Sequence, residues 1–135
     1  MTAYDLRDTF TALRTAMLVG TAGNTFGQRV YLALAPARTA TPYVQVQLVT
    51  LDAERTFDQE GYSSTVQLSA YFPLSTGPAA AAAGAAALRA NVGKTKLTIA
   101  GQTNLTCHVA RERGPFRDSD LWRVDIDLTI RSLET

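Results

Sequence analysis

Apolar and polar residues alternate along the segment from Asp120 to Arg131. A period of two over this length predicts a long β-strand with one face buried and the other face in water. Five large apolar side chains share one row of this strand: Trp122, Val124, Ile126, Leu128 and Ile130. Such a row needs an apolar layer beneath it, and we interpret the rest of the chain as the source of that layer.

Two earlier segments, Tyr43–Leu51 and Tyr62–Phe72, alternate in the same way. The apolar side of the first carries Val44, Val46 and Leu48, and that of the second carries Val66, Leu68, Ala70 and Phe72. Their opposite sides carry glutamine, serine and threonine, as expected of antiparallel neighbours in a sheet with one polar face. The polar segment 52–61 between them is long for a turn, and we interpret it as two strand extensions around a tip.

Three shorter strands are predicted at Arg29–Leu34, Lys94–Ala100 and Asn104–Arg111, the last with Leu105, Cys107 and Val109 pointing inward. Segment 20–28 holds three glycines in nine positions and is predicted to be a loop, as is segment 35–42 with its two prolines. Segment 113–118, around Gly114 and Pro115, is predicted to connect the last two strands as a hairpin.

Two segments have the features of helices. Apolar residues at intervals of four, three and four predict a first helix over Ala3–Leu18, and Thr2 and Asp5 have the spacing of a capping box: the apolar stripe is Leu6, Phe10, Leu13 and Met17. The segment Ala79–Asn91 is almost all alanine. Because alanine is the best helix former, we predict a packed helix there instead of a linker, with Gly84 tolerated inside it.

This order of elements predicts the α+β class. The shared parity of the apolar positions implies a single, mainly antiparallel β-sheet with two α-helices packed on one face. The length of 135 residues suits one domain, residues 1–135.

Composition narrows the classes of partner. The net charge of +1 provides no strong attraction to nucleic acid or to anionic membranes. The single cysteine excludes an internal disulfide, and neither a signal peptide nor a membrane-spanning stretch is evident, so the residues alone predict a soluble cytosolic domain. Charged residues make up only 19% of the chain, which is typical of subunits with polar, low-charge contact surfaces.

No group of residues predicts a catalytic, cofactor-binding or metal site. Cys107 and His108 are neighbours on a strand, so their side chains point to opposite faces and cannot act as a nucleophile and its base. Asp125 and Asp127 share one face about 7 Å apart. Arg123 and Arg131 flank them in the same row, which favours alternating charge on a solvated face over a glycosidase pair.

The chain order resembles that of the small tail-terminator, or tail-completion, proteins of long-tailed phages and gene transfer agents. The resemblance covers nearly the whole chain and rests on the order and spacing of several short motifs. These are Arg29-Val30-Tyr31, Ala35-Pro36, Pro42-Tyr43-Val44, the strand Val66–Tyr71, the alanine-rich helix ending near Leu88, and the strand Trp122–Leu128.

The resemblance implies a structural virion protein without enzymatic activity or cofactor. Such a subunit forms a ring, usually of six copies, on the head-proximal end of the tail tube, after assembly in the host cytoplasm. Its implied partners are further copies of itself, the tail tube protein and the head connector or stopper. DNA passes through the ring without sequence-specific binding, and no membrane is involved.

Two segments are candidates for contacts with neighbouring subunits or the tube, because they are long and mixed in charge. The first offers Arg55, Phe57, Asp58 and Glu60, and the second offers Arg111, Arg113 and Arg117. The second could also contact a phosphate, and a plain solvated tip is the simpler interpretation of it. Another head–tail connector or minor tail component is the alternative function, followed by a small-molecule-binding α+β domain.

Overall fold

The computed structural model describes residues 6–18, 20–36, 39–55, 60–92 and 102–134, with side chains for 10–18, 20, 23–36, 39–47, 63–92 and 107–131. The chain runs in the order α1 (Leu6–Met17), α2 (Gly20–Phe26), β1 (Val30–Leu32), β2 (Tyr43–Arg55), β3 (Glu60–Pro73), the 3-10 turn η1 (Leu74–Thr76), α3 (Gly77–Val92), β4 (Gln102–Asp118) and β5 (Leu121–Glu134). The predicted strand at 94–100 and the predicted helix start at 3–5 lie outside the described residues.

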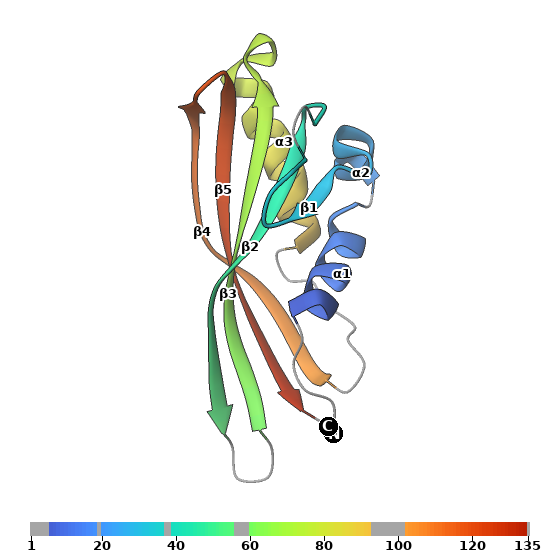
Figure 1. The fold of residues 1–135 in the computed structure, drawn as a ribbon, viewed down its shortest axis with the longest axis vertical. Helices are drawn as coiled ribbons and strands as arrows, with labels where there is room; N and C mark the ends of the chain where they lie inside the picture. The colour runs from blue at the N-terminus through green and yellow to red at the C-terminus, as the bar shows by residue number, and fades with distance from the viewer. Residues whose placement is uncertain (1–5, 19, 37–38, 56–59, 93–101, 135) are drawn as a thin grey trace.

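The described strands form one sheet in the order β1-β2-β3-β5-β4. β2, β3, β5 and β4 pair in antiparallel fashion, whereas β1 runs parallel to β2, with Val30 opposite Val44. The α+β class is therefore confirmed, and the short β1 makes the sheet mixed. Figure 1 shows the helices on the same side of the sheet, with the far ends of β2 and β3 extending past them.

The prediction of a loop at 20–28 is wrong, because α2 occupies most of it. The glycines there are compatible with a short helix. Gly20 and Gly27 bracket it with positive φ angles of 62° and 60°, which favour glycine. Inside the helix, a Cβ on Gly23 would lie 2.7 Å from the backbone oxygen of Leu18, so glycine is needed for the close approach of α1 and α2.

The core lies between the helices and the inner face of the sheet. The predicted inward residues with described side chains are buried or pack against the core, with Trp122 and Val109 half-buried at its margin. The side chains of Leu48 and Leu105 lie outside the described residues. Full burial of one such aliphatic side chain stabilises the fold by about 1.5–3 kcal/mol, so this face dominates the stability.

The alanine-rich segment forms a packed helix, as predicted. Its buried positions recur at intervals of four, three and four: Ala81, Ala85, Leu88 and Val92. A Cβ on Gly84 would lie 2.5 Å from Cε1 of Phe72, which is shorter than any van der Waals contact. Small side chains and one glycine thus let α3 lie directly on the aromatic ring of β3.

The turn between the last two strands is not where the sequence indicated. β4 continues through Gly114 and Pro115 to Asp118, and β5 begins at Leu121. Gly114 and Pro115 fit within the strand because the strand pairing shifts register between Arg113 and Phe116, as it also does beside Val109. Proline is tolerated there because β4 is an edge strand of the described sheet and needs fewer backbone donors. The strand extensions predicted for 52–61 are confirmed by β2 and β3.

We predict that Gly84→Ala destabilises the protein by roughly 1–2 kcal/mol, although the same change in an exposed helix stabilises by up to about 1 kcal/mol. The added Cβ overlaps the Phe72 ring. Chemical denaturation of Gly84→Ala measures the cost. In a Phe72→Leu background the same substitution should be neutral or stabilising, and an equal cost in both backgrounds would contradict the steric explanation.

The buried Cys107 thiol predicts a specific alkaline instability. Burial raises the pKa of Cys107 from its ordinary 9.0 to about 12. The folded state therefore favours the neutral thiol. The contribution of Cys107 to stability is constant below pH 9 and falls as the pH rises toward about 12, by up to roughly 4 kcal/mol. Denaturation between pH 8 and pH 12 should show a flatter pH dependence for Cys107→Ala than for the wild type, and parallel curves would contradict this assignment.

Candidate assembly surface

We call the face of the sheet opposite the helices the open face (Figure 1). The strand pairing places polar and aromatic residues on it. The strand register aligns them into three rows across β2, β3, β5 and β4. The rows are Tyr43–Tyr71–Arg123–Phe116, Gln45–Ser69–Asp125–Arg113 and Gln47–Gln67–Asp127–Arg111. Directly opposed side chains in an antiparallel sheet are close neighbours, so the register places the four side chains of each row next to one another.

The first row combines aromatic rings with one cation. Tyr43 and Tyr71 stack with their ring centroids 4.9 Å apart and their planes at 23°. The guanidinium carbon of Arg123 lies 5.7 Å from the centroid of Tyr71 and 5.6 Å from that of Phe116. These distances allow cation–π attraction on both sides of Arg123. Phe116 is still 39% exposed, so the row ends in an apolar group available for contact.

The second row is organised around the carboxylate of Asp125, which is only 3% exposed. Its Oδ1 accepts a hydrogen bond from Ser69 Oγ at 2.9 Å and one from Arg123 Nε at 2.7 Å. A guanidinium nitrogen of Arg113 lies 3.5 Å from Oδ2. A buried carboxylate requires such partners, and here they come from three strands. Asp125 therefore fixes the relative positions of Ser69, Arg123 and Arg113.

The third row contains a looser ion pair. Arg111 Nε lies 3.5 Å from Asp127 Oδ2, and Arg113 reaches the other oxygen at 3.8 Å. The side chains of Arg111 and Arg113 remain 65% and 45% exposed. Exposed pairs of this kind contribute little to stability, so both guanidinium groups remain available to a partner.

Burial and neighbouring charges shift several pKa values on this face. Burial raises the pKa of Tyr43 and of Tyr71, and Asp118 raises both further. Burial alone would lower the pKa of Arg123, but its hydrogen bonds to Asp125 and Asp118 outweigh that effect and raise it. Arg123 donates to Asp118 at 3.1 Å. The first row is therefore neutral at its tyrosines and charged at its arginine over the physiological range.

The predicted contact residues do not all fall on this face. Arg111 and Arg113 lie on it, whereas Arg117 is paired with Trp122 in the row that faces the helices, and its Nε donates to the Ser119 backbone oxygen at 3.3 Å. Arg55 and Glu60 are paired at the ends of β2 and β3, with side chains outside the described residues. Phe57 and Asp58 also lie outside the described residues.

The sequence did not single out the network around Asp125. The interpretation of a solvated row of alternating charge is wrong for Asp125, which is buried by its cross-strand neighbours. The available signal was the long polar sides of the predicted strands: once β3 and β5 are aligned, Ser69 falls opposite Asp125. That alignment joins residues 56 positions apart.

The described residues hold no group of three histidine, cysteine, aspartate or glutamate side chains that could bind a metal ion. Cys107 is buried while His108 is exposed, as their opposite directions on β4 require. Among the described helices, none is long and apolar enough to cross a membrane. What the open face does present is ordered aromatic rings and arginines, the side chains most enriched at protein–protein interfaces.

The comparison of this sequence with known protein families is consistent with a surface for protein–protein contacts. Residues 11–132 match the family model described as Tail completion protein gp17. The chain belongs to this tail completion family. It is thus a structural protein of phage-type tails and a component of virion assembly. Membership also implies assembly with other tail or head proteins.

Solved structures share the fold. A chain from the virion of a native gene transfer agent particle is 22% identical, with a TM-score of 0.70, over 97% of this chain and 99% of that chain. A second solved chain, for which no activity is named, is 17% identical with a TM-score of 0.64, over 98% of each chain. No curated protein sequence matches. The tail completion chain therefore shares its whole fold with a virion component.

We predict that Asp125→Asn destabilises the fold by about 2 kcal/mol, because it leaves Arg123 and Arg113 without their buried counter-charge. Thermal or chemical denaturation measures the effect. The matched control is Asp118→Asn, since Asp118 also bonds Arg123 but its side chain is 39% exposed, and its loss should cost less than about 1 kcal/mol. Equal costs for the two variants would show that burial of Asp125 does not set its contribution.

Proposed function

We propose that this tail completion protein caps the tail tube as a closed ring, that it ends tube polymerisation, and that it provides the surface that joins the tail to the head. The proposal rests on one observation above the others: the helices occupy one side of the sheet and leave the open face, with its ordered arginines and aromatic rings, uncovered by the described chain. Family membership and the shared fold of a gene transfer agent virion chain support it.

A ring requires that each subunit offer two different surfaces, because heterologous contacts that close by rotation form rings. The open face supplies one such surface. Arg111, Arg113 and Phe116 are its exposed members, and Asp125 holds the residues behind them in place. Because these groups are already oriented, little side-chain freedom is lost when a partner binds.

The proposed partners follow from the location of the ring at the end of the tail tube. Each subunit contacts neighbouring copies of itself in a ring of six in total, as well as the tail tube protein and the head connector or stopper. The net charge of +1 suits a lumen through which DNA slides, because a strongly basic lumen would retain it. The whole of residues 1–135 acts as one domain, and its function is structural, with no reaction and no cofactor.

The hairpin of β2 and β3 is the second contact in the proposal. Its strands extend past the helices (Figure 1). Arg55 and Glu60 end its two strands, and Phe57 and Asp58 lie between them in the sequence. Mixed charge and one aromatic residue on such an arm suit a contact with the tube or with a neighbouring subunit.

We predict that Arg111→Ser with Arg113→Ser lowers the yield of joined particles at least tenfold, because the variant removes two exposed cations of the open face and keeps the Arg123–Asp125 bond. Electron microscopy of particles produced with the variant measures the yield of heads with tails and the length of tail tubes. Unjoined heads and over-long tubes are the expected result.

The control is Arg117→Ser, which removes a cation from the same strand on the opposite face. It should leave particle yield unchanged. Normal particles from the double variant would contradict the role of the open face. Labelling of the chain anywhere other than the head-proximal end of the tail would refute the ring proposal and favour another connector or minor tail component.

A further inference from the structure

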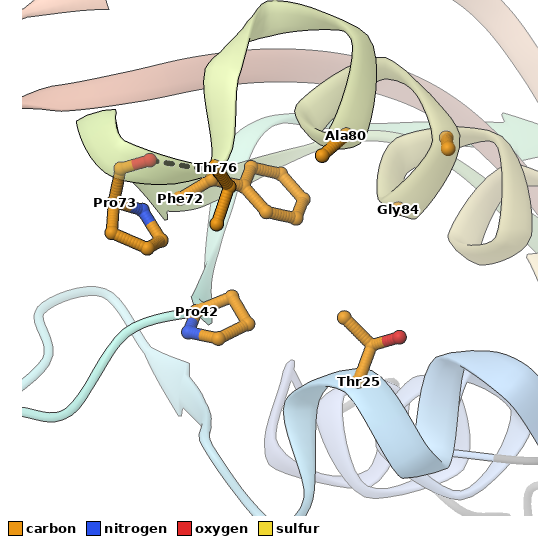
Figure 2. Close-up of a pocket in the computed structure, with 8 residues that line it drawn as sticks. Thr25, Pro42, Phe72, Pro73, Thr76, Ala80 and Gly84 are labelled. Atoms are coloured by element: carbon orange, nitrogen blue, oxygen red, sulfur yellow. Dashed lines mark hydrogen bonds between the residues drawn. The ribbon is translucent and has the colours of Figure 1, made fainter.

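Two apolar features of the molecule take no part in the open face. The first is an open pocket of ≈ 420 Å³ between α2, the start of β2, the end of β3 and α3, shown in Figure 2. Its wall carries no charged side chain and includes Thr25, Pro42, Phe72, Pro73, Ala80 and Ala83. An apolar cavity of about 150 Å³ already holds a benzene molecule, so this pocket has room for a large aliphatic side chain and a small neighbour.

The wall of the pocket is held in place by hydrogen bonds. Arg29 donates from Nε to the Pro42 backbone oxygen at 2.8 Å and from a terminal nitrogen to the Thr25 backbone oxygen at 3.2 Å, which ties α2 to the start of β2. Thr76 Oγ1 donates to the Pro73 backbone oxygen at 2.8 Å on the opposite side (Figure 2). The pocket is therefore formed before any partner enters it.

The second feature is the segment Ala33–Pro36, which is wholly apolar and follows β1. Leu34 within it is 75% exposed, and it is one of two large apolar side chains exposed in the described part of the chain. The other, Phe116, lies against Arg123 on the open face. Leu34 thus presents an apolar side chain to water at a fixed position.

Backbone geometry fixes that position. Ala33 has a φ of 66°, an uncommon conformation for a residue with a side chain. Its N–H donates to the Val46 backbone oxygen at 2.8 Å, and the N–H of Leu34 donates to the Leu32 backbone oxygen at 2.9 Å. A strained conformation kept by the surrounding structure is found most often where it orients a functional group. Here it holds the turn in which the Leu34 side chain is exposed.

Leu34 cannot enter the pocket of its own chain. β1 is parallel to β2, so Leu32 is level with Val46 while the pocket residue Pro42 precedes Tyr43 at the other end of the pair. Four strand residues separate these levels, which is roughly 13 Å at the rise of an extended chain. The apolar group and the apolar pocket therefore lie at opposite ends of β1.

We propose that Leu34 and its apolar neighbours from one copy insert into the pocket of the next copy. This contact joins two different patches of the same chain, so when it is not reciprocated between the same two copies it is heterologous and can close a ring by rotation. A reciprocal contact would give a two-fold dimer instead, which the cross-linking below would reveal as covalent dimers without larger species. The inference rests on the proposed ring and names one contact between its subunits, in addition to the open face. The occupant is a second copy because the chain itself carries the complementary apolar segment, preset in position, and cannot use it internally.

The test is a covalent cross-link in the full chain carrying Leu34→Cys and Ala83→Cys together. The native Cys107 does not compete, because it is buried and its pKa is raised to about 12. With a short bis-maleimide the double variant should give a ladder of covalent oligomers, both in solution at high concentration and on tail tubes. Each single variant should give no species larger than a dimer, and absence of the ladder would overturn the contact.

Blocking the pocket gives an independent readout. Ala83→Phe fills the pocket from an exposed position and should reduce ring formation at least tenfold, as should Leu34→Asp. Ala82→Phe, also exposed on α3 but outside the pocket wall, is the matched control and should form rings normally, as should Leu34→Met. Circular dichroism confirms that the variants are folded.

The outcomes separate this contact from the proposed function. Wild-type rings together with unaffected Leu34→Asp and Ala83→Phe rings would overturn the contact and leave the ring proposal standing. A cross-linked ladder without rings on wild-type tail tubes would support the contact and overturn the ring. Occupation of the pocket by a tube or connector segment would appear when Ala83→Cys carries a maleimide–benzophenone photo-cross-linker, whose second group inserts into C–H bonds. A cross-link to that protein alone also overturns the contact.

Discussion

The close packing of α3 on the inner face of the sheet is the constraint on which the rest of the structure depends. Alternating apolar residues on β3 and β5 are buried only because a helix of small side chains can lie directly on them. Gly84 sets the spacing at Phe72, where even a methyl group would overlap the ring. With the aliphatic side chains of β3 and β5 that the structure describes committed to this face, the opposite face carries polar and aromatic groups that need other partners.

On that opposite face, one buried carboxylate organises the exposed groups. Asp125 binds Ser69 and Arg123 directly, and Arg123 in turn lies between two aromatic rings. The arrangement offers cations and an aromatic edge in fixed positions while the chain as a whole stays nearly neutral. Such a surface can recognise a specific protein neighbour without attracting nucleic acid indiscriminately.

The alternating segments allowed the sheet, its inner face and the alanine-rich helix to be predicted, because side-chain periodicity reports burial directly. The α2 helix was not predicted, because its glycines indicate a loop. In the structure these glycines lie at the helix ends and allow the close approach to Leu18. Likewise, Gly114 and Pro115 indicated a turn but lie inside β4. The burial of Asp125 could not be predicted from its sequence neighbours. Ser69 lies opposite Asp125 only because of the register between β3 and β5, which are far apart in the sequence.

The irregularity of β4 has a consequence for how the chain behaves before it meets its partners. A regular strand of 17 residues at the margin of a sheet is a template on which another chain can add its own backbone, which leads to aggregates. Register shifts, a glycine with a φ of 107° and a proline without an N–H interrupt that template. Association is thereby directed to side-chain surfaces. Contacts between such surfaces can form a closed assembly of limited size, whereas strand addition at an open edge has no end point.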